Sequence, residues 1–224
     1  MFGKNKVTRP TKKYDGFFNV NSIFYTIQGE GVLSGCPAVF IRLQGCNLQC
    51  SFCDTSFDNG VRVQINHIVS NVTSISNSRT KLVVITGGEP FLQPIEHLCK
   101  YLIKAGFTVQ IETNGTIWRT LPKKVRIVCS PKFDTHGNIT TLHSSLLKKL
   151  SCLKFLLSDS NPLYSKIPIA LELQAKKIGI PIYVQPLDEG DMLKNKNNTK
   201  LTTEIALEKG YNISLQIHKI LDIE

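Results

Sequence analysis

The 224-residue sequence lacks the long apolar runs that membrane proteins and secreted precursors carry. No run approaches the roughly 18 consecutive apolar residues of a membrane span. Residues 1–16 hold five basic side chains and no apolar core, so they lack the hydrophobic region of a secretory signal. These absences argue against a membrane protein or an exported one. They predict a cytoplasmic protein in which residues 1–16 form a loose basic extension.

Acidic side chains are also scarce, 17 against 27 basic ones, which gives a net charge of +10. Such a surface can attract nucleic acid or a small anion. The basic clusters are not interleaved with aromatic side chains, as single-strand binders require, so we expect a solvated, solubilising surface and no direct contact with nucleic acid. A basic iron–sulfur or zinc module that binds nucleic acid stays open as an alternative.

The seven cysteines are an odd number and form no disulfide framework. Four of them stand among apolar neighbours, as expected for reduced, buried thiols. These four are Cys36, Cys99, Cys129 and Cys152. The other three, Cys46, Cys50 and Cys53, lie in the stretch CNLQCSFCDT and have the spacing C-x3-C-x2-C. Only these three form a pattern.

This spacing provides three soft ligands without a fourth. A structural zinc site normally has four protein ligands, and a catalytic zinc usually uses histidine or carboxylate. The nearest following histidine is His67, and no second C-x-x-C pair is present. Three thiolates suit iron and sulfide better, because they can hold three corners of a cubane [4Fe-4S] cluster and leave the fourth iron open for a small molecule. A zinc site and three redox or surface thiols remain alternatives.

Apolar, β-branched runs alternate with helix-length segments along the chain. The expected strands, mostly continuous as in strands buried on both faces, are 38–43, 82–85, 107–111, 125–128, 153–157, 180–184 and 213–215. The expected helices, several of which end at a glycine, are 66–75, 95–105, 142–150, 169–178 and 203–209. We expect the polar segment 191–200 to be a surface loop.

The alternation predicts an α/β fold with parallel strands and right-handed crossovers, either an open doubly wound sheet or a whole or partial β/α barrel. Unusual motifs follow the carboxyl ends of six expected strands, namely the cysteines, TGGEP, ETNGT, SPK, QP and QIH. In parallel α/β architectures those ends form one rim, where loops build active sites. The motifs therefore predict one shared cavity and an enzyme.

The cysteine spacing resembles that of the radical S-adenosylmethionine (SAM) superfamily, in which the methionine moiety of SAM chelates the open iron. The TGGEP stretch is similar to that superfamily's GGEP motif, which holds the methionine amino group. Its paired glycines permit close backbone approach, and Glu89 can accept from an ammonium. SPK and ETNGT also resemble cofactor-contacting loops. The resemblance implies the cofactor-binding residues Gly87, Gly88, Glu89, Thr113, Asn114, Ser130, Pro131 and Lys132.

A longer set of motifs resembles the 7-carboxy-7-deazaguanine synthase family of queuosine biosynthesis, a tRNA-modification pathway. These motifs are SIFYTIQGEG, FIRLQGCNLQCSFCDT, TGGEP, ETNGT, SPK and LQIHKILDIE. Phe52 stands where relatives commonly have tryptophan. The resemblance implies one compact radical SAM core domain over residues 17–224, folded as a partial β/α barrel of about six parallel strands. Its N- and C-terminal segments would bind the substrate.

The resemblance also implies a lyase reaction, the ring contraction of 6-carboxy-5,6,7,8-tetrahydropterin to 7-carboxy-7-deazaguanine with loss of ammonia. A 5'-deoxyadenosyl radical formed from SAM would start it. The implied accessories are Mg²⁺, an electron donor such as flavodoxin or ferredoxin, and a homodimer. A glycyl-radical-enzyme activating enzyme shares the cluster spacing and is the alternative, although such an enzyme lacks the IQGEG segment and needs a protein partner.

By the same resemblance, specific residues would bind the substrate and magnesium. Arg42 would pair with the substrate carboxylate, which a planar guanidinium binds bidentately. Thr55 would contact Mg²⁺, and because one hydroxyl is a poor site for a hard dication, the substrate carboxylate and waters would complete the octahedron. The expected substrate-binding residues are Ile27, Gln28, Gly29, Glu30, Arg42, Thr86, Gln216 and His218.

Overall fold

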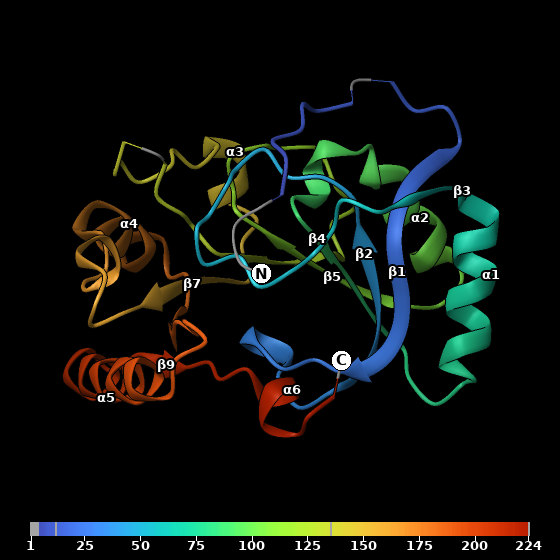
Figure 1. Ribbon diagram of the computed structural model, residues 1–224. Helices are drawn as coiled ribbons and strands as arrows, with labels where there is room; N and C mark the ends of the chain where they lie inside the picture. The colour runs from blue at the N-terminus through green and yellow to red at the C-terminus, as the bar shows by residue number, and fades with distance from the viewer. Residues whose placement is uncertain (1–4, 12, 135, 224) are drawn as a thin grey trace.

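One nine-stranded sheet runs through the residues that the computed structural model describes, 5–11, 13–134 and 136–223 (Figure 1). The strands lie in the order β3-β1-β2-β4-β5-β6-β7-β8-β9. They are β1 (Phe17–Ile27), β2 (Pro37–Leu43), β3 (Val61–Gln64), β4 (Leu82–Gly87), β5 (Thr108–Thr113), β6 (Arg126–Cys129), β7 (Cys152–Leu157), β8 (Ile182–Pro186) and β9 (Asn212–Ile213). Each neighbouring pair from β2 to β9 is parallel, whereas β1 pairs antiparallel with β2 and β3. The predicted α/β fold with parallel strands is confirmed.

Most of the helices lie in connections between strands, whereas the last helix follows the final strand and lies at the cavity. The helices are α1 (Ile65–Ser76), α2 (Ile95–Lys104), α3 (Ser144–Leu147), α4 (Ile169–Ile178), α5 (Met192–Lys209) and α6 (Ile217–Ile220), with 3-10 turns η1 (Gly31–Leu33), η2 (Pro90–Leu92) and η3 (Pro162–Tyr164). In Figure 1, α1 and α2 lie beside β1 and β2, and α4 and α5 lie at the other end of the sheet. Within the described ranges, none of the helices combines the length and hydrophobicity needed to cross a membrane.

The two faces of the sheet differ in chemistry because side chains alternate along each strand. One face belongs to the main hydrophobic core, which also takes in the apolar sides of α1 and α2. Its strand residues include Ile41, Ile85, Ile111, Phe155 and Val184. Alternate positions on the same strands line a cavity with polar side chains. These include Arg42, Glu112, Lys154 and Gln185.

Most predicted elements overlap observed ones, but the antiparallel edge of the sheet was not predicted. Each of the seven expected strands overlaps one of the parallel strands, and β1 and β3 are additional. The expected helix over 142–150 is the single turn α3. Among the described residues the parallel part of the sheet runs from β2 through β4 to β9, which is seven strands where about six were expected. The last of them, β9, has only two residues.

The prediction that residues 191–200 form a surface loop is wrong, because they begin the long helix α5. The Asp191 side chain caps this helix by accepting from the Lys194 backbone N–H at 2.9 Å. Asn198 is buried, and its amide donates to the Leu187 carbonyl at 2.8 Å. The polar residues that suggested a loop therefore cap the helix and bond inside the protein.

Residues 5–11 are also not the loose extension that was expected. The backbone of Val7 bridges that of Cys46 in parallel, and the Thr8 N–H donates to the Cys46 carbonyl at 2.6 Å. Further along, the Thr11 N–H donates to the Leu92 carbonyl at 2.7 Å. Residues 1–4 and 12 of the predicted extension lie outside the described residues, and its separation from a core domain over 17–224 stays a prediction.

Candidate active site

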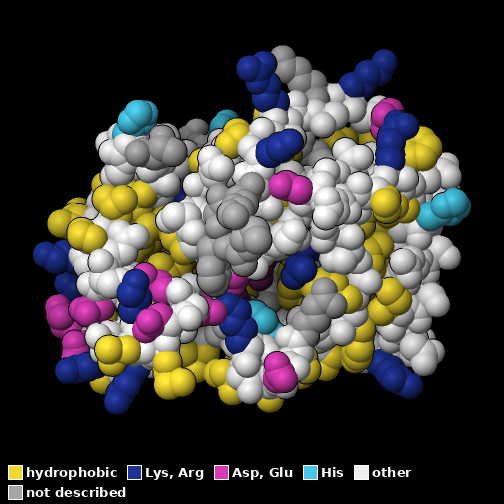
Figure 2. All heavy atoms as spheres, viewed as in Figure 1, with side chains coloured by type: hydrophobic (Ala, Val, Ile, Leu, Met, Phe, Trp, Pro, Cys, Tyr) yellow, Lys and Arg dark blue, Asp and Glu magenta, His cyan; other side chains and the backbone are white. Residues whose placement is uncertain are grey.

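A cavity of about 560 Å³ lies on the polar face of the sheet. Figure 2 shows a hollow near the middle of one face of the molecule, bordered by acidic, basic and histidine side chains. Its volume is within the range of small-molecule sites, roughly 300–1,000 Å³. The loops after β2, β4, β5, β6 and β8 and the segment after β9 all contribute lining residues. The six motifs thus meet at one cavity, as the sequence predicts.

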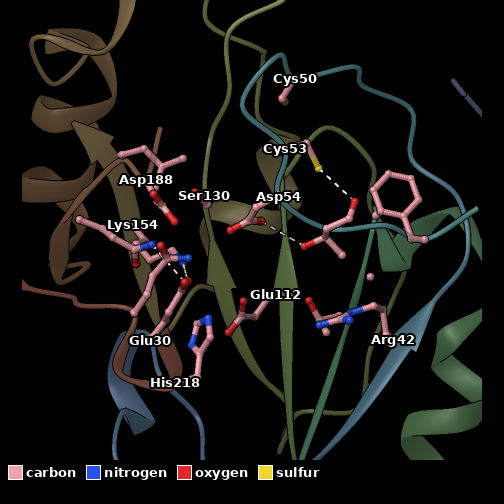
Figure 3. A pocket seen from close by; sticks show the side chains of 18 of the residues that line it. Glu30, Arg42, Cys50, Cys53, Asp54, Glu112, Ser130, Lys154, Asp188 and His218 are labelled. Atoms are coloured by element: carbon pink, nitrogen blue, oxygen red, sulfur yellow. Dashed lines mark hydrogen bonds and ion pairs between the residues drawn. The ribbon is translucent and has the colours of Figure 1, made fainter. Parts of the chain in front are cut away.

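Three thiols, those of Cys46, Cys50 and Cys53, line one end of the cavity, where Figure 3 labels the latter two. All three are half-buried. Burial raises the pKa of each thiol, that of Cys46 to about 12. Nearby negative charge acts in the same direction, from neighbouring thiolates at Cys46 and Cys50 and from Asp54 at Cys53. An anionic three-thiolate site here therefore needs a bound positive group.

The arrangement of these thiols fits a cluster better than a single ion. Among the described residues, no three His, Cys, Asp or Glu side chains converge closely enough to hold one metal ion. A cubane spreads its ligands over different iron atoms, so its three thiolates surround a volume instead of a point. Three half-buried thiols at the edge of a cavity, with no fourth ligand, fit this requirement.

Gly87 and Gly88 let the loop after β4 pack tightly against the start of the cysteine loop. A Cβ on Gly88 would lie 2.1 Å from the Gly45 carbonyl oxygen, and one on Gly87 would lie 2.1 Å from that of Leu43. Gly87 also has φ +137°, a conformation that side chains rarely allow. Both glycines line the cavity next to the cysteines.

Glu89 lies behind the cavity wall, although the sequence places it among the cofactor-binding residues. Its carboxylate accepts from the Asn114 N–H at 2.7 Å, the Phe91 N–H at 3.0 Å and the Thr113 hydroxyl at 2.8 Å. Burial raises the pKa of Glu89 to about 7 despite these hydrogen bonds. Glu89 therefore fixes the loop after β5, whose Thr113 and Asn114 line the cavity.

The SPK loop after β6 directs one cation toward the thiols. Lys132 Nζ donates to the Ser130 carbonyl at 2.8 Å and to its hydroxyl at 2.5 Å. Burial lowers the pKa of Lys132, while the nearby thiolates, that of Cys50 foremost, raise it. Ser130 and Lys132 line the cavity, whereas Pro131 is buried and is not a lining residue. The Lys132 ammonium offsets part of the negative charge that three thiolates bring.

The opposite end of the cavity carries a connected polar network (Figure 3). Glu30 forms an ion pair with Lys154 on β7, and its other oxygen accepts from Gln185 Nε2 at 3.1 Å. The Glu30 N–H donates to Gln28 Oε1 at 3.1 Å, and Gln28 Nε2 donates to Glu112 Oε1 at 2.7 Å. Burial lowers the pKa of Lys154 and raises that of Glu112. Two carboxylates, an ammonium and two amides thus line one half of the cavity.

Sequence reasoning did not select three members of this polar network as site residues. They are Glu112, Lys154 and Gln185. Each had a signal: Glu112 opens ETNGT, Gln185 opens QP, and Lys154 interrupts an apolar strand of the sequence CLKFLL. A lysine in a buried strand requires a partner, and here that partner is Glu30.

The C-terminal segment closes the cavity between its two ends. Lys219 Nζ contacts Asp54 of the cysteine loop at 2.6 Å and Asp188 after β8 at 2.5 Å. Gln216 and His218 line the cavity. Burial, and then the charge of Lys219, lowers the pKa of His218, which favours the neutral imidazole.

Gly29 does not line the cavity but makes room for the C-terminal segment. A Cβ on Gly29 would lie 2.3 Å from His218 Nδ1, and the Gly29 carbonyl accepts from the Ile217 N–H at 3.4 Å. The neighbouring Ile27 and Gln28 are lining residues. In the IQGEG segment, Ile27, Gln28 and Glu30 therefore line the cavity, whereas Gly29 allows the C-terminal segment to pack closely.

Arg42 lies across the cavity from the Glu30–Lys154 pair (Figure 3). It is next to Thr86 in the parallel register of β2 and β4, and its guanidinium carbon is 5.0 Å from the centroid of the Phe24 ring. Thr55, the expected magnesium ligand, also lines the cavity. Its hydroxyl donates to Asp54 Oδ1 at 3.3 Å. Both residues that the resemblance implies, Arg42 for the substrate carboxylate and Thr55 for Mg²⁺, therefore line the cavity.

Comparison with known proteins gives a consistent result. The Radical SAM superfamily matches residues 40–150. The 7-carboxy-7-deazaguanine synthase of Rickettsia prowazekii (strain Madrid E) is 46% identical over 230 residues, which is 100% of this chain and 96% of the relative. That of Rhodospirillum rubrum is 35% identical over 100% of both chains. The crystal structure of QueE from Escherichia coli has a TM-score of 0.72 at 24% identity over 89% of this chain and 94% of that one, which confirms the predicted fold.

The fold, the three-thiol end of the cavity and these matches define a radical SAM enzyme, so a [4Fe-4S] cluster and SAM are its cofactors. Within that class, the chain belongs to the 7-carboxy-7-deazaguanine synthase family, a family of lyases. The family predicted from the motifs is confirmed. The glycyl-radical-enzyme activating enzyme, kept as the alternative, is not favoured.

Proposed function

We propose that this chain converts 6-carboxy-5,6,7,8-tetrahydropterin to 7-carboxy-7-deazaguanine and releases ammonia, as a step of queuosine biosynthesis. The observation that carries the proposal is the two-ended cavity, in which three thiols face a network of carboxylates, amides and cations. A pterin has a guanidine-like edge and ring nitrogens that need hydrogen-bond partners, and the substrate adds a carboxylate. When bound, the cluster and SAM supply the radical that removes hydrogen from the substrate.

The cysteine end holds the cofactors in this proposal. Cys46, Cys50 and Cys53 would hold the cluster, and Lys132 would place a positive charge beside it. Gly87 and Gly88 have no side chains, which lets the loop after β4 pack against the backbone of Leu43 and Gly45. Their backbone lines the cavity beside the cysteines and would lie next to the methionine part of SAM. Thr113, Asn114 and Ser130 offer hydroxyl and amide groups to the rest of SAM.

The polar end holds the substrate. Arg42 binds its carboxylate, and the neighbouring Thr86 contacts the ring from β4. Glu30 accepts from the guanidine-like edge, and Lys154 keeps the Glu30 carboxylate charged and oriented. Glu30 is already paired with Lys154 and Gln185 before substrate binds, so this carboxylate needs little reorganisation when the substrate enters.

The C-terminal segment excludes water from the reaction. Gln216 and His218 reach the cavity from the segment that Lys219 ties to Asp54 and Asp188. Water exclusion matters because a carbon-centred radical must react only with the substrate. Ile27 contributes an apolar wall on the same side.

Four accessory features belong to the proposal. We propose that Thr55 and the substrate carboxylate together bind Mg²⁺, so calorimetry should detect tight Mg²⁺ binding only when substrate is present. We also propose an electron donor such as flavodoxin or ferredoxin, a homodimeric assembly and a cytoplasmic location, which the resemblance to the family implies. Both donors are acidic electron carriers, and the net charge of +10 favours their approach.

Product formation tests the proposed reaction. Protein with an anaerobically reconstituted cluster is incubated with SAM, a reductant, Mg²⁺ and the carboxypterin. We expect 7-carboxy-7-deazaguanine to form from the free pterin, with many turnovers for each SAM because the cofactor is regenerated. Cleavage of SAM to methionine without this product would overturn the proposed substrate. A requirement for a protein partner would favour the activating enzyme instead.

A further inference from the structure

Residues 5–11, here called the N-terminal strap, lie along the cysteine loop and are fixed at both ends. Near its start, Val7 bridges Cys46 and the Thr8 N–H donates to the Cys46 carbonyl at 2.6 Å. Near its end, the Thr11 N–H donates to the Leu92 carbonyl at 2.7 Å. The strap thus uses backbone hydrogen bonds to reach one of the three cluster cysteines directly.

The body of the protein is adapted to the strap. Gly45, immediately before the first cysteine, has φ +93°, and a Cβ there would lie 3.2 to 3.3 Å from the Thr8 side chain. Arg119 donates to the carbonyls of Thr11 and Phe91, the latter at 2.8 Å. Its guanidinium is also 3.6 Å from Glu96 of α2. One half-buried arginine, Arg119, therefore ties the end of the strap to η2 and α2.

The first described residue of the strap, Asn5, reaches a second cluster cysteine. Its amide nitrogen Nδ2 donates to the Thr55 carbonyl at 2.9 Å and to Cys53 Sγ at 3.8 Å. The Cys53 thiol itself points its proton toward the Thr55 carbonyl, at 3.7 Å. That proton is lost when Cys53 ligates iron, whereas the two amide protons of Asn5 remain. The Asn5 amide is thus placed to donate to the thiolate.

We propose that Asn5 is a positioning residue of the [4Fe-4S] site, which hydrogen-bonds Cys53 Sγ from the N-terminal strap and makes the bound cluster easier to reduce. The reduced cluster carries one more negative charge than the oxidised cluster, so a donor to its sulfur ligand stabilises the reduced form more. Partners of metal ligands commonly tune a site in this way. The inference rests on the cluster named in the proposed function.

Potentiometric titration of the cluster in the full chain tests this role, with the electron paramagnetic resonance (EPR) signal of the reduced cluster as the readout. Asn5→Ala removes the donor. We expect about a tenfold smaller equilibrium constant for one-electron reduction, which is a potential about 59 mV more negative. Val7→Ala is the matched control, because Val7 is 61% exposed and joins the strap through its backbone. Its potential should equal that of the wild type.

A second variant, Asn5→Asp, has nearly the shape of asparagine without the N–H donors, so it tests the same point if Asn5→Ala does not fold. Its potential should fall at least as far, because it also adds negative charge. Potentials of both variants that match the Val7→Ala control would overturn the role of Asn5. A wild-type protein without iron and sulfide would instead overturn the proposed function, so the two failures are distinguishable.

Discussion

The two ends of the cavity are built in opposite ways. The cysteine end comes from one loop, in which Cys46, Cys50 and Cys53 lie within eight residues. The polar end is assembled from the segment after β1 and from β2, β5, β7 and β8, and its ion pair joins residues 124 positions apart. The first end is therefore visible as a motif, whereas the second exists only once the sheet has formed.

The two ends also differ in how their charges are balanced. At the cysteine end, burial raises the pKa of every thiol, and the thiolates need a bound cluster. At the polar end, Glu30 and Lys154 already neutralise each other. Loss of one thiol should therefore abolish cofactor binding at the cysteine end. Loss of one charge of the Glu30–Lys154 pair should destabilise the fold at the polar end.

The largest effect is expected at the cysteine end. Replacing Cys53 by alanine leaves two thiolates, so we expect loss of the cluster and at least about a thousandfold loss of product formation, since the chemistry depends on the cofactors. Iron content and product yield measure this. Cys36→Ala is the control, because Cys36 is also a half-buried free thiol but does not line the cavity. Equal iron content in both variants would contradict the assignment.

The next effect concerns the polar end and appears as stability. Lys154→Met leaves the Glu30 carboxylate buried without its cation, and we expect a loss of about 3–5 kcal/mol in the free energy of unfolding. Lys176→Met removes the exposed cation of an i,i+4 pair with Glu172 and should cost far less than Lys154→Met. Denaturant unfolding of the metal-free proteins measures both. Similar losses would mean that the buried pair does not stabilise this end.

A smaller effect is expected for substrate binding. Arg42→Lys keeps the positive charge but loses the bidentate hydrogen bonding of a guanidinium with a carboxylate. We therefore expect KM for the carboxypterin to rise about 10- to 100-fold, with cluster content unchanged. Steady-state kinetics and an iron assay check this. An unchanged KM would remove Arg42 from the substrate site and leave the carboxylate to another cation.

A pH dependence of stability is expected at the wall of the cysteine end, and at any one pH step it is small. Because the folded-state pKa of Glu89, about 7, is above its ordinary value of 4.5, the folded protein binds an extra proton between these pH values. This stabilising contribution is complete below pH 4.5 and is lost as the pH rises through 7. Glu89→Gln should flatten the fall in unfolding free energy over this window, by up to about 1.4 kcal/mol per pH unit.

Unfolding of the metal-free variants at a series of pH values measures that slope. Glu208→Gln serves as the control, because its side chain is 71% exposed on α5. The same slope in wild type and in Glu89→Gln would show that Glu89 is ionised throughout this pH range, held by its hydrogen bonds.

The fold was predictable where the apolar pattern of a segment in the sequence matches its burial in the folded protein. The apolar runs of β4 and β7 are strands because one face packs on helices and the other bounds a cavity. The segment 191–200 was not predictable, because the contact of Asn198 with the Leu187 carbonyl is invisible before folding. The strands β1 and β3 were also not predictable, because many of their side chains are exposed or half-exposed and their sequences contain no continuous apolar run.

The site was predictable where its residues lie close together in the sequence, and not where they meet only in the folded sheet. The sequence singled out Cys46, Cys50 and Cys53 because the three thiols lie within eight residues, and all three line the cavity. Lys154 was missed because its role depends on which strand face lines the cavity, a property of the sheet. Glu89 was expected at the cofactor, but its carboxylate is engaged by the loop after β5.

The central claim is that the three-thiol end leaves one iron open to SAM. The most direct measurement is the EPR spectrum of the reduced, anaerobically reconstituted protein before and after addition of SAM. The claim requires iron and sulfide near four per chain, by the stoichiometry of a [4Fe-4S] cluster, and a spectrum that changes when SAM binds the open iron. A colourless protein that holds zinc, or a cluster whose spectrum is unchanged by SAM, would contradict it.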